Sequence, residues 1–436
     1  MLAKREGITY RRLTQESADQ IMRRHEMLHT GKLGGARASF AYADLTGLDL
    51  SGRQLNDADF TGAILSEANL EGTQMESATL FGADLRRACL KGANMRRSDL
   101  RGVCMRGADL TGADMYQADL REGMIAERDR KGNLKFLRRD LGPSELPAAI
   151  MAQANLERAK MGGVVAMQAD FTDANLCNCS LARANLRNAT MRGALMENAD
   201  LSGADMTGAD LEGAVMAGVQ SDMTVFDGAN LKDVLRDETS GRSLAELPRP
   251  VDEMLDDHEA WVKTEGKEGD PCLLGDMDLR SIKGLANRDL TAFVAPGATF
   301  FGMDLAGVRF QGAQLAGADL RNTKLIGADL RGANLSNAKL TGCDLRDANL
   351  GPLIIGDDRI MPVQLTRANM RYCNLQGADL RHGDLKDVDM SHANLVGANL
   401  RNASFANATL TGAMITHTAF RDVFADGVVG AKLLPQ

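Results

Sequence analysis

Apolar residues recur at every fifth position over residues 38–120, and this spacing constrains the possible folds more than any other feature of the sequence. One column holds only Leu, Met or Phe, and it begins with Phe40, Leu45 and Leu50. A second column lies two places earlier and is mostly Ala, as at Ala38. Each unit of five residues therefore carries one large and one small apolar side chain.

Neither common secondary structure explains a period of five. An amphipathic helix requires apolar residues about every 3.6 positions, and a half-buried strand requires them at every second position. A period of five directs apolar side chains to the interior only if the chain turns a corner every five residues. The residues between the two columns include Gly, Asp, Asn and Ser, which favour turns. The sequence therefore predicts short extended segments joined by regular corners.

Units such as Ala108-Asp109-Leu110-Thr111-Gly112 and Ala333-Asn334-Leu335-Ser336-Asn337 resemble those of the pentapeptide repeat family. The resemblance implies an all-β solenoid, a right-handed quadrilateral β-helix with four repeats per coil and the central Leu or Phe inside. It implies a function only loosely, because members are diverse. The best-understood members resemble DNA in shape and charge and bind DNA gyrase. With four repeats per coil, residues twenty apart should stack, and Phe40 and Phe60 have this spacing.

The chain ahead of the repeats, residues 1–37, is expected to form a cap. A helix that begins after Thr14 or Ser17 and ends near His29 would cover the first coil, because the terminal units of solenoids need protection. His25 and His29 have the helical spacing of a metal-binding pair. Packing and solvent contact explain them better, since the sequence offers no third ligand.

The first solenoid is expected to span residues 38–235, with an insertion at 123–153. The insertion is predicted to form a β-hairpin that turns near Gly132, followed by a short helix that ends at Gln153. The repeats then resume at Leu156. A loop that projects from a rigid scaffold often carries function, and simple packing against one side of the coil is the alternative.

A second break in composition, residues 236–271, contains dense acid, proline residues and the only Trp. A helix from Pro250 to about Thr264 is expected there. Its segment 255–262 repeats the pattern of 21–28, in which His-Glu follows an apolar residue and a pair of charges. We therefore expect a second capping helix and a second solenoid.

The second solenoid is expected to span residues 272–436. Its repeats slip by one place near Gly284. They are interrupted at 351–362, where either a bulged side or a small hairpin would fit. The less regular segment that begins at Val423 is expected to form a C-terminal cap, and a dimer contact is the alternative.

The sequence contains no phosphate-binding loop, nucleophile elbow or zinc-binding helix, so we predict a protein that is not an enzyme and needs no cofactor or metal. Cysteines such as Cys179 and Cys272 take the small inward place and are expected to be buried thiols. His25 and His258 are expected to share one structural role, a hydrogen bond to the first coil. The first residues, up to Leu13, lack the apolar segment that a signal peptide requires. No run reaches the ~18 apolar residues that a membrane span requires. A soluble, cytoplasmic protein is expected.

Charge argues against mimicry of DNA along the coils. The chain has a net charge of −8. Duplex DNA carries about one charge per 1.7 Å, so a rod of about fifteen coils would need roughly 40 negative charges. Residues 236–276 hold twelve acidic and five basic residues, which leaves the coils themselves close to neutral.

Basic residues gather in one part of the first solenoid and in its hairpin. Most of them follow a central residue, so they are expected on successive sides of the rod. The group contains no aromatic residue that could stack on a base, and a solvated surface is the competing interpretation. The nine candidate partner-binding residues are Arg86, Lys91, Arg96, Arg97, Arg101, Arg106, Arg128, Arg130 and Lys131.

We therefore expect a non-enzymatic, rod-like interaction scaffold whose partner is an unidentified protein. A regulator that mimics DNA and binds DNA gyrase or another topoisomerase is the first alternative. Nucleic-acid binding through the basic residues is the second alternative. A homodimer formed through one end of a solenoid is a further possibility for self-association.

Overall fold

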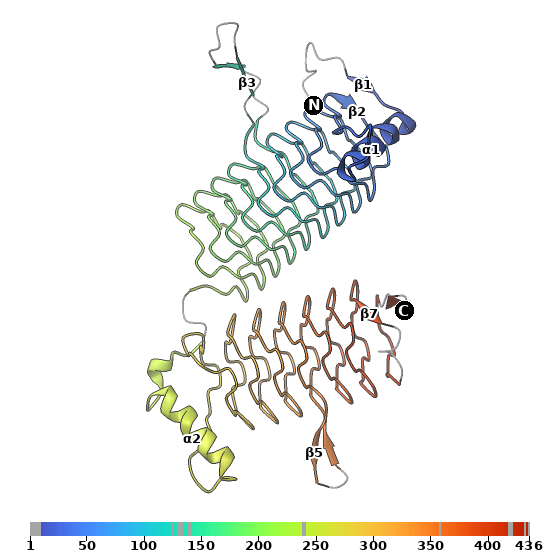
Figure 1. Ribbon diagram of the computed structural model, residues 1–436. Helices are drawn as coiled ribbons and strands as arrows, with labels where there is room; N and C mark the ends of the chain where they lie inside the picture. The colour runs from blue at the N-terminus through green and yellow to red at the C-terminus, as the bar shows by residue number, and fades with distance from the viewer. Residues whose placement is uncertain are drawn as a thin grey trace. The chain divides into compact units, whose positions relative to one another are not determined.

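The computed structural model divides into two units, Met1–Asp237 and Glu238–Gln436, which we describe separately. Each unit is a stack of flattened coils (Figure 1). For residues 125–128, 134–137, 416 and 433–434 the structure describes only the backbone. The described residues are 10–123, 125–128, 134–137, 142–237, 241–356, 359–416, 422–430 and 433–434.

Each coil has four short sides, and neighbouring coils pair in parallel. In the first unit Asp59 pairs with Thr79, which pairs in turn with Asp99. Over residues 38–120 both inward columns that the sequence predicts are buried, except that Leu48 and Arg53 of the small column are half-buried. The expectation that residues twenty apart stack is confirmed, and the rings of Phe40 and Phe60 lie with their centroids 5.0 Å apart.

The corners explain why Gly, Asn and Asp fill many of the outward places. At each corner the N–H of the small inward residue donates to the carbonyl of the central residue, as from Ala63 to Phe60 at 2.9 Å. The residue just before the small inward one has a positive φ, for example 60° at Asp57 and 62° at Gly62. Glycine adopts this conformation without strain, and Asn and Asp adopt it more readily than most other residues.

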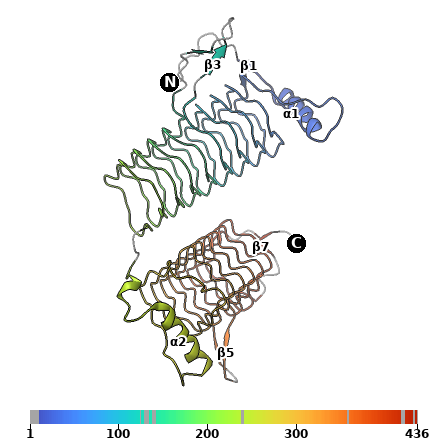
Figure 2. The ribbon, with the colours of Figure 1, turned by 60° about the vertical axis from the view of Figure 1, so that its left-hand side comes forward.

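Helix α1 (Gln15–His29) begins the described part of unit 1 together with β1 (Arg11–Arg12), as Figure 2 shows from a second direction. The Thr14 side chain caps the helix by accepting the N–H of Ser17. The side-chain amide of Gln15 donates to the carbonyl of Asp49 at 2.7 Å and accepts the N–H of Asp49 at 2.9 Å. This pair of hydrogen bonds fixes the start of the helix to the first coil.

The insertion in unit 1 contains a β-hairpin. Strand β3 (Ile125–Arg128) pairs antiparallel with β4 (Leu134–Leu137). Figure 1 shows β3 outside the stack of coils. The turn predicted near Gly132 lies outside the described residues.

The helix predicted between this hairpin and Gln153 was wrong, because residues 144–153 form coil sides and corners. Glu145 pairs with Cys104, 41 residues earlier, so the repeats resume well before Leu156. Pro147 suggested a helix start. It instead occupies the first position of a corner, where the φ of about −65° that proline requires is normal.

The first helix in the described part of unit 2 is a short 3-10 helix, η1 (Leu244–Glu246), and α2 (Val251–Lys263) follows it. The coil that follows contains one extra residue. Leu273 pairs with Val294, which is one place beyond the usual spacing of twenty. The predicted slip of one place near Gly284 is therefore confirmed.

The interruption of the repeats at 351–362 is a hairpin and not a bulged side. Strand β5 (Leu353–Ile355) pairs antiparallel with β6 (Arg359–Met361). The coil continues beyond the hairpin because Asn334 pairs with Gln364.

The segment from Val423 continues the coil where a C-terminal cap was predicted. Phe424 pairs with Ser404, and Val429 pairs with Thr409. Val423 packs against the core from an inward place, which explains why an apolar residue there does not signal a cap. The two remaining parallel pairs join β1 with β2 (Ala43–Asp44) and β7 (Ile415–Thr416) with β8 (Leu433–Leu434).

Each unit has its own apolar core, which runs along the inside of its coils. Met22 of α1 belongs to the first core, and Leu255 of α2 belongs to the second. Both helices therefore cover an end of the stack that would otherwise expose apolar side chains. Within the described part of the chain, no helix is long and apolar enough to cross a membrane.

Candidate partner-binding surface

The basic residues selected within the coils lie on successive sides of unit 1. Arg86, Lys91, Arg96, Arg101 and Arg106 each follow a central residue. Each coil has four sides of five residues, so a step of five carries the side chain to the next side. These residues therefore surround the coils and do not form one flat patch.

Each of these basic side chains forms an ion pair with a carboxylate. Arg86 pairs through two N–H groups with Asp84 of its own repeat, at 2.8 and 2.7 Å. Arg96 reaches Asp114 in the next coil at 2.9 Å. Within residues 86–106 the only acidic residue is Asp99. The sequence therefore does not reveal the other carboxylates, several of which lie on a neighbouring coil about twenty residues away. The ion pairs are Arg86–Asp84, Arg87–Glu67, Lys91–Asp109, Arg96–Asp114, Arg97–Glu76, Arg101–Asp99 and Arg106–Glu145.

These ion pairs orient the basic side chains more than they stabilise the fold. Exposed pairs contribute about 0–1 kcal/mol each. The hydrogen bond to Asp109 raises the pKa of Lys91, and the hydrogen bond to Asp99 raises the pKa of Arg101. Lys91 and Arg101 therefore stay protonated at neutral pH, and their ion pairs give both side chains a preferred direction on the surface.

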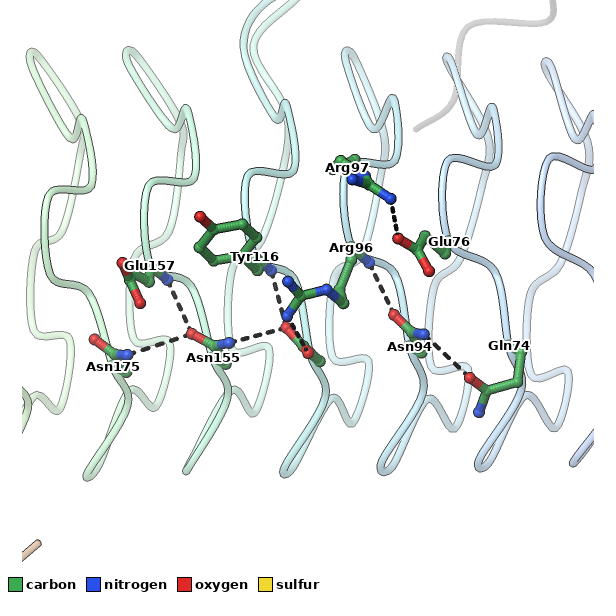
Figure 3. A network of polar contacts seen from close by, with 10 residues as sticks. Gln74, Glu76, Asn94, Arg96, Arg97, Tyr116, Asn155, Glu157 and Asn175 are labelled. Carbon is green, nitrogen blue, oxygen red and sulfur yellow. Dashed lines mark hydrogen bonds and ion pairs between the residues drawn. The ribbon is translucent and has the colours of Figure 1, made fainter.

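One side of unit 1 carries a network of polar side chains that crosses several coils (Figure 3). The guanidinium of Arg96 lies over the ring of Tyr116, with its central carbon 4.4 Å from the ring centroid. The backbone N–H of Arg96 donates to Asn94 at 3.2 Å. Asn155 donates to Asp114, the carboxylate that Arg96 also binds, at 3.0 Å. The network therefore holds a charged group and an aromatic ring together in one orientation.

The prediction that no aromatic residue accompanies the basic residues was wrong. Tyr116 lies one coil from Arg96, and Phe81 lies one coil from Arg101, whose guanidinium is 5.4 Å from the ring centroid. Such contacts contribute about 0.5–1 kcal/mol at exposed sites. The sequence signal is a spacing of twenty between an arginine and an aromatic residue in the same corner place.

Of the three candidate residues in the hairpin, the structure describes only the backbone of Arg128. The backbone of Arg128 lies in β3, where the residue pairs with Leu134. The Arg128 side chain and the whole of Arg130 and Lys131 lie outside the described residues. These three residues stay predictions from the sequence.

The hairpin of β5 and β6 presents an apolar face that sequence reasoning missed. Ile354 and Ile360 are cross-strand neighbours and are 72% and 48% exposed. The other face packs on the coil at Gly332, where a Cβ atom would lie 2.9 Å from Leu353 and 3.0 Å from Met361. The glycine therefore allows the hairpin to pack closely, and the isoleucine pair stays exposed on the opposite face.

The histidines with metal-binding spacing are engaged in the structure. The Nε2 atom of His25 lies 3.2 Å from Nε2 of His29 and 2.9 Å from the carbonyl of Asn56, and Nδ1 of His25 accepts the N–H of Ala38 at 3.0 Å. Because Nδ1 uses its lone pair for Ala38, neutral His25 carries its proton on Nε2 and has no lone pair there for a metal. In the part of the chain that the structure describes, no three His, Cys, Asp or Glu residues gather as metal ligands would.

Comparison with solved structures finds repeat proteins of the same type, and the comparison with curated proteins found no match. HetL of Nostoc sp. strain PCC 7120, a pentapeptide repeat protein involved in heterocyst differentiation regulation, is 24% identical and covers 77% of this chain and 97% of its own, with a TM-score of 0.27. Rfr23 of Cyanothece 51142, a pentapeptide repeat protein, is 25% identical and covers 31% of this chain and 91% of its own, with a TM-score of 0.26. QnrB1, a plasmid-mediated fluoroquinolone resistance protein, is 17% identical and covers 47% of this chain and 93% of its own, with a TM-score of 0.26.

The family model named pentapeptide repeats matches most of the coils in both units. Its matches together cover more than half of the chain. The matched ranges are 43–82, 54–92, 78–117, 149–178, 179–218, 289–322, 296–332, 313–351, 363–387 and 384–422. The predicted right-handed β-helix of five-residue repeats is thereby confirmed. The chain belongs to the pentapeptide repeat family.

Proposed function

We propose that this protein is a non-enzymatic scaffold that binds a protein partner through the side of unit 1 carrying Arg96 and Tyr116. The observation that carries the proposal is the stacked pair in Figure 3, in which Asp114 also binds the guanidinium. Arginine and tyrosine are enriched at the centres of protein interfaces. A stacked and hydrogen-bonded pair loses little side-chain entropy when a partner binds.

The network extends this surface on both sides of the stacked pair. Asn94 donates to Gln74 at 3.1 Å in one direction, and Asn175 donates to Asn155 at 3.3 Å in the other. The side-chain amides therefore repeat at the spacing of the coils and are oriented before any partner arrives. A partner that matches this surface needs hydrogen-bonding groups at a regular spacing and a group that packs on Tyr116.

The charges of this side favour a partner of mixed charge over nucleic acid or a partner that recognises DNA. A phosphate group would have to compete with the carboxylates that already bind Arg96 and Arg97. Mimicry of DNA toward DNA gyrase would require uncompensated acids, whereas Glu76 and Asp114 are both paired with arginine. The capture experiment below can also detect binding to gyrase and binding to nucleic acid.

The proposal is tested by affinity capture from the native host with the full-length chain and two matched variants. Arg96→Ala removes the stacked guanidinium. Arg187→Ala is the control, because Arg187 has the same place in its repeat and also pairs with the Asp 18 residues ahead, Asp205, on another side of unit 1. Captured proteins are quantified by mass spectrometry with and without nuclease treatment.

We expect at least one protein to be captured roughly tenfold less by Arg96→Ala and equally by Arg187→Ala, as for an interface residue worth more than 1 kcal/mol. If no captured protein depends on Arg96, the proposed surface is wrong. Capture of gyrase subunits, with inhibition of supercoiling by the wild-type chain, would establish the gyrase alternative. Loss of every captured protein after nuclease treatment would instead indicate binding to nucleic acid.

A further inference from the structure

Both capping helices contain a buried histidine that binds the first coil in the same way. In unit 1 the Nδ1 atom of His25 accepts the N–H of Ala38 at 3.0 Å. In unit 2 the Nδ1 atom of His258 accepts the N–H of Cys272 at 3.1 Å. The two histidines are 1% and 0% exposed. We refer to each of these two hydrogen bonds as a latch.

Each latch requires a neutral imidazole ring. Since Nδ1 accepts through its lone pair, the ring proton of each neutral histidine is on Nε2. In unit 1 this Nε2–H donates to the carbonyl of Asn56 at 2.9 Å. In unit 2 Nε2 of His258 makes no hydrogen bond of ordinary geometry among the described residues, and the Thr291 backbone is its polar neighbour. A second proton can enter only at Nδ1, where it would face the backbone N–H and abolish the latch.

The groups around His25 favour its neutral form. Burial lowers the pKa of His25 below the ordinary value of 6.5, and the neighbouring His29 lowers it further. The carbonyl of Asn56 and the carboxylate of Asp57 raise the pKa, and Arg37 lowers it. The sum of these effects is a lowered pKa, so the docked ring is neutral at neutral pH.

His258 has the same preference in a different environment. Burial lowers its pKa below 6.5, against the opposing effects of the Thr291 backbone and of the Asp289 and Glu259 carboxylates. Undocked histidine takes up a proton more readily than docked histidine in both caps. Each latch therefore contributes its full stabilisation above pH 6.5 and loses it progressively as the pH falls from 6.5 through the lowered pKa.

A second contact beside each latch does not depend on this proton. The residue after each histidine is a glutamate that pairs with an arginine in the first coil, Glu26 with Arg53 at 3.5 Å and Glu259 with Arg288 at 3.2 Å. Both arginines occupy the inward place that alanine takes in most repeats. Neither ion pair involves the imidazole proton, so both pairs tether a loosened helix.

We propose that the two capping helices are pH-sensitive covers. Protonation of His25 and His258 at mildly acidic pH breaks both latches and loosens α1 and α2 from the ends of the stacks that they protect. Met22 of α1 and Leu255 of α2, which are buried against those ends, then become accessible. The exposed ends carry apolar side chains and unpaired backbone groups, which favour association with another chain.

The test measures hydrogen exchange of the full-length protein by mass spectrometry at pH 7.5 and pH 5.0, corrected for the intrinsic effect of pH. Peptides within 15–40 and 251–273 report the caps, and peptides within 305–345 report the middle of a stack. At pH 5.0 we expect exchange in the cap peptides to be roughly 5- to 150-fold faster, as for an N–H that loses its acceptor. The stack peptides should not change. Fluorescence of Trp261, the only tryptophan and stacked on His258 with the ring centroids 5.6 Å apart, gives a second readout for α2.

Two variants separate the latch from other effects of acid. His258→Gln keeps a side-chain acceptor that does not titrate, so exchange in 251–273 should become independent of pH while that in 15–40 still responds. His382→Gln is the control, because His382 is an exposed histidine that lies outside both caps. An equal pH response in His258→Gln and wild type would overturn the proposal. Unchanged cap exchange in the wild type would also overturn it, whether or not the variants dock their caps.

Discussion

Replacement of Gly307 by alanine tests how the corners of neighbouring coils stack. Gly307 has a φ of 64°, and a Cβ atom there would overlap the side-chain oxygen of Asn287 in the preceding coil. Gly327 is the matched position at the same corner one coil later. It has a φ of 63°, and an added Cβ would meet no atom within 4 Å. The two glycines differ only in what lies against them.

The expected loss of stability follows from these two contacts. Alanine in the left-handed region costs about 1–2 kcal/mol at either position. At Gly307 the end of the Asn287 side chain must also move aside, which costs a further 0.5–1.5 kcal/mol or so if its torsion angles are displaced. We therefore expect the free energy of unfolding to fall by about 1–2 kcal/mol for Gly327→Ala and by about 1.5–3.5 kcal/mol for Gly307→Ala.

The assay is urea unfolding followed by the fluorescence of Trp261, because this residue lies in α2 of the same unit as both glycines. The double variant Asn287→Gly/Gly307→Ala should recover the additional loss, since glycine adopts the φ of 62° at position 287 without strain. Equal urea midpoints for the two single variants would refute the reasoning. Failure of Asn287→Gly to recover stability would refute it as well.

Two further predictions concern the interior and the thiols. Ala333→Trp should lower the free energy of unfolding by more than about 3 kcal/mol, because the filled interior cannot accept the added volume, whereas Ala306→Trp at an outward place should leave the urea midpoint nearly unchanged. Burial, together with the nearby Glu197, raises the pKa of the Cys177 thiol to about 12, so iodoacetamide at pH 8 should alkylate Cys177 far more slowly than a free cysteine. Peptide mass spectrometry would contradict this if Cys177 reacted at the rate of a model thiol.

The coil could be predicted from the sequence because its pattern is local. One side and one corner fit within five residues, so the columns that begin at Phe40 and Ala38 define the interior without knowledge of the rest of the chain. The ends of α1 were also predictable, since Thr14 is a typical capping residue and caps the helix in the structure. The residue at which the first insertion ends and the coils resume was not predictable, because Pro147 suits a helix start and a corner equally well.

The contacts of the candidate surface depend on residues about one coil apart, and this is why the sequence did not reveal them. Tyr116 follows Arg96 by twenty residues and becomes its neighbour only when the length of the coil is known. The partner of Arg106 is further displaced, because the insertion places Glu145 39 residues away. The arginines that bind the capping helices, Arg53 and Arg288, were missed because a charged residue in an inward place looks like an error in the repeat.

Both hairpins leave the rod at a corner without changing the pairing of the coils on either side. Cys104 pairs with Glu145 across one insertion, and Asn334 pairs with Gln364 across the other. Extra chain at such a corner needs only that its two ends return to the same place, and the entropy of closing a longer loop rises slowly with length. New recognition loops can therefore be added along this framework at intervals of one coil, about 4.8 Å, while the buried columns stay unaltered.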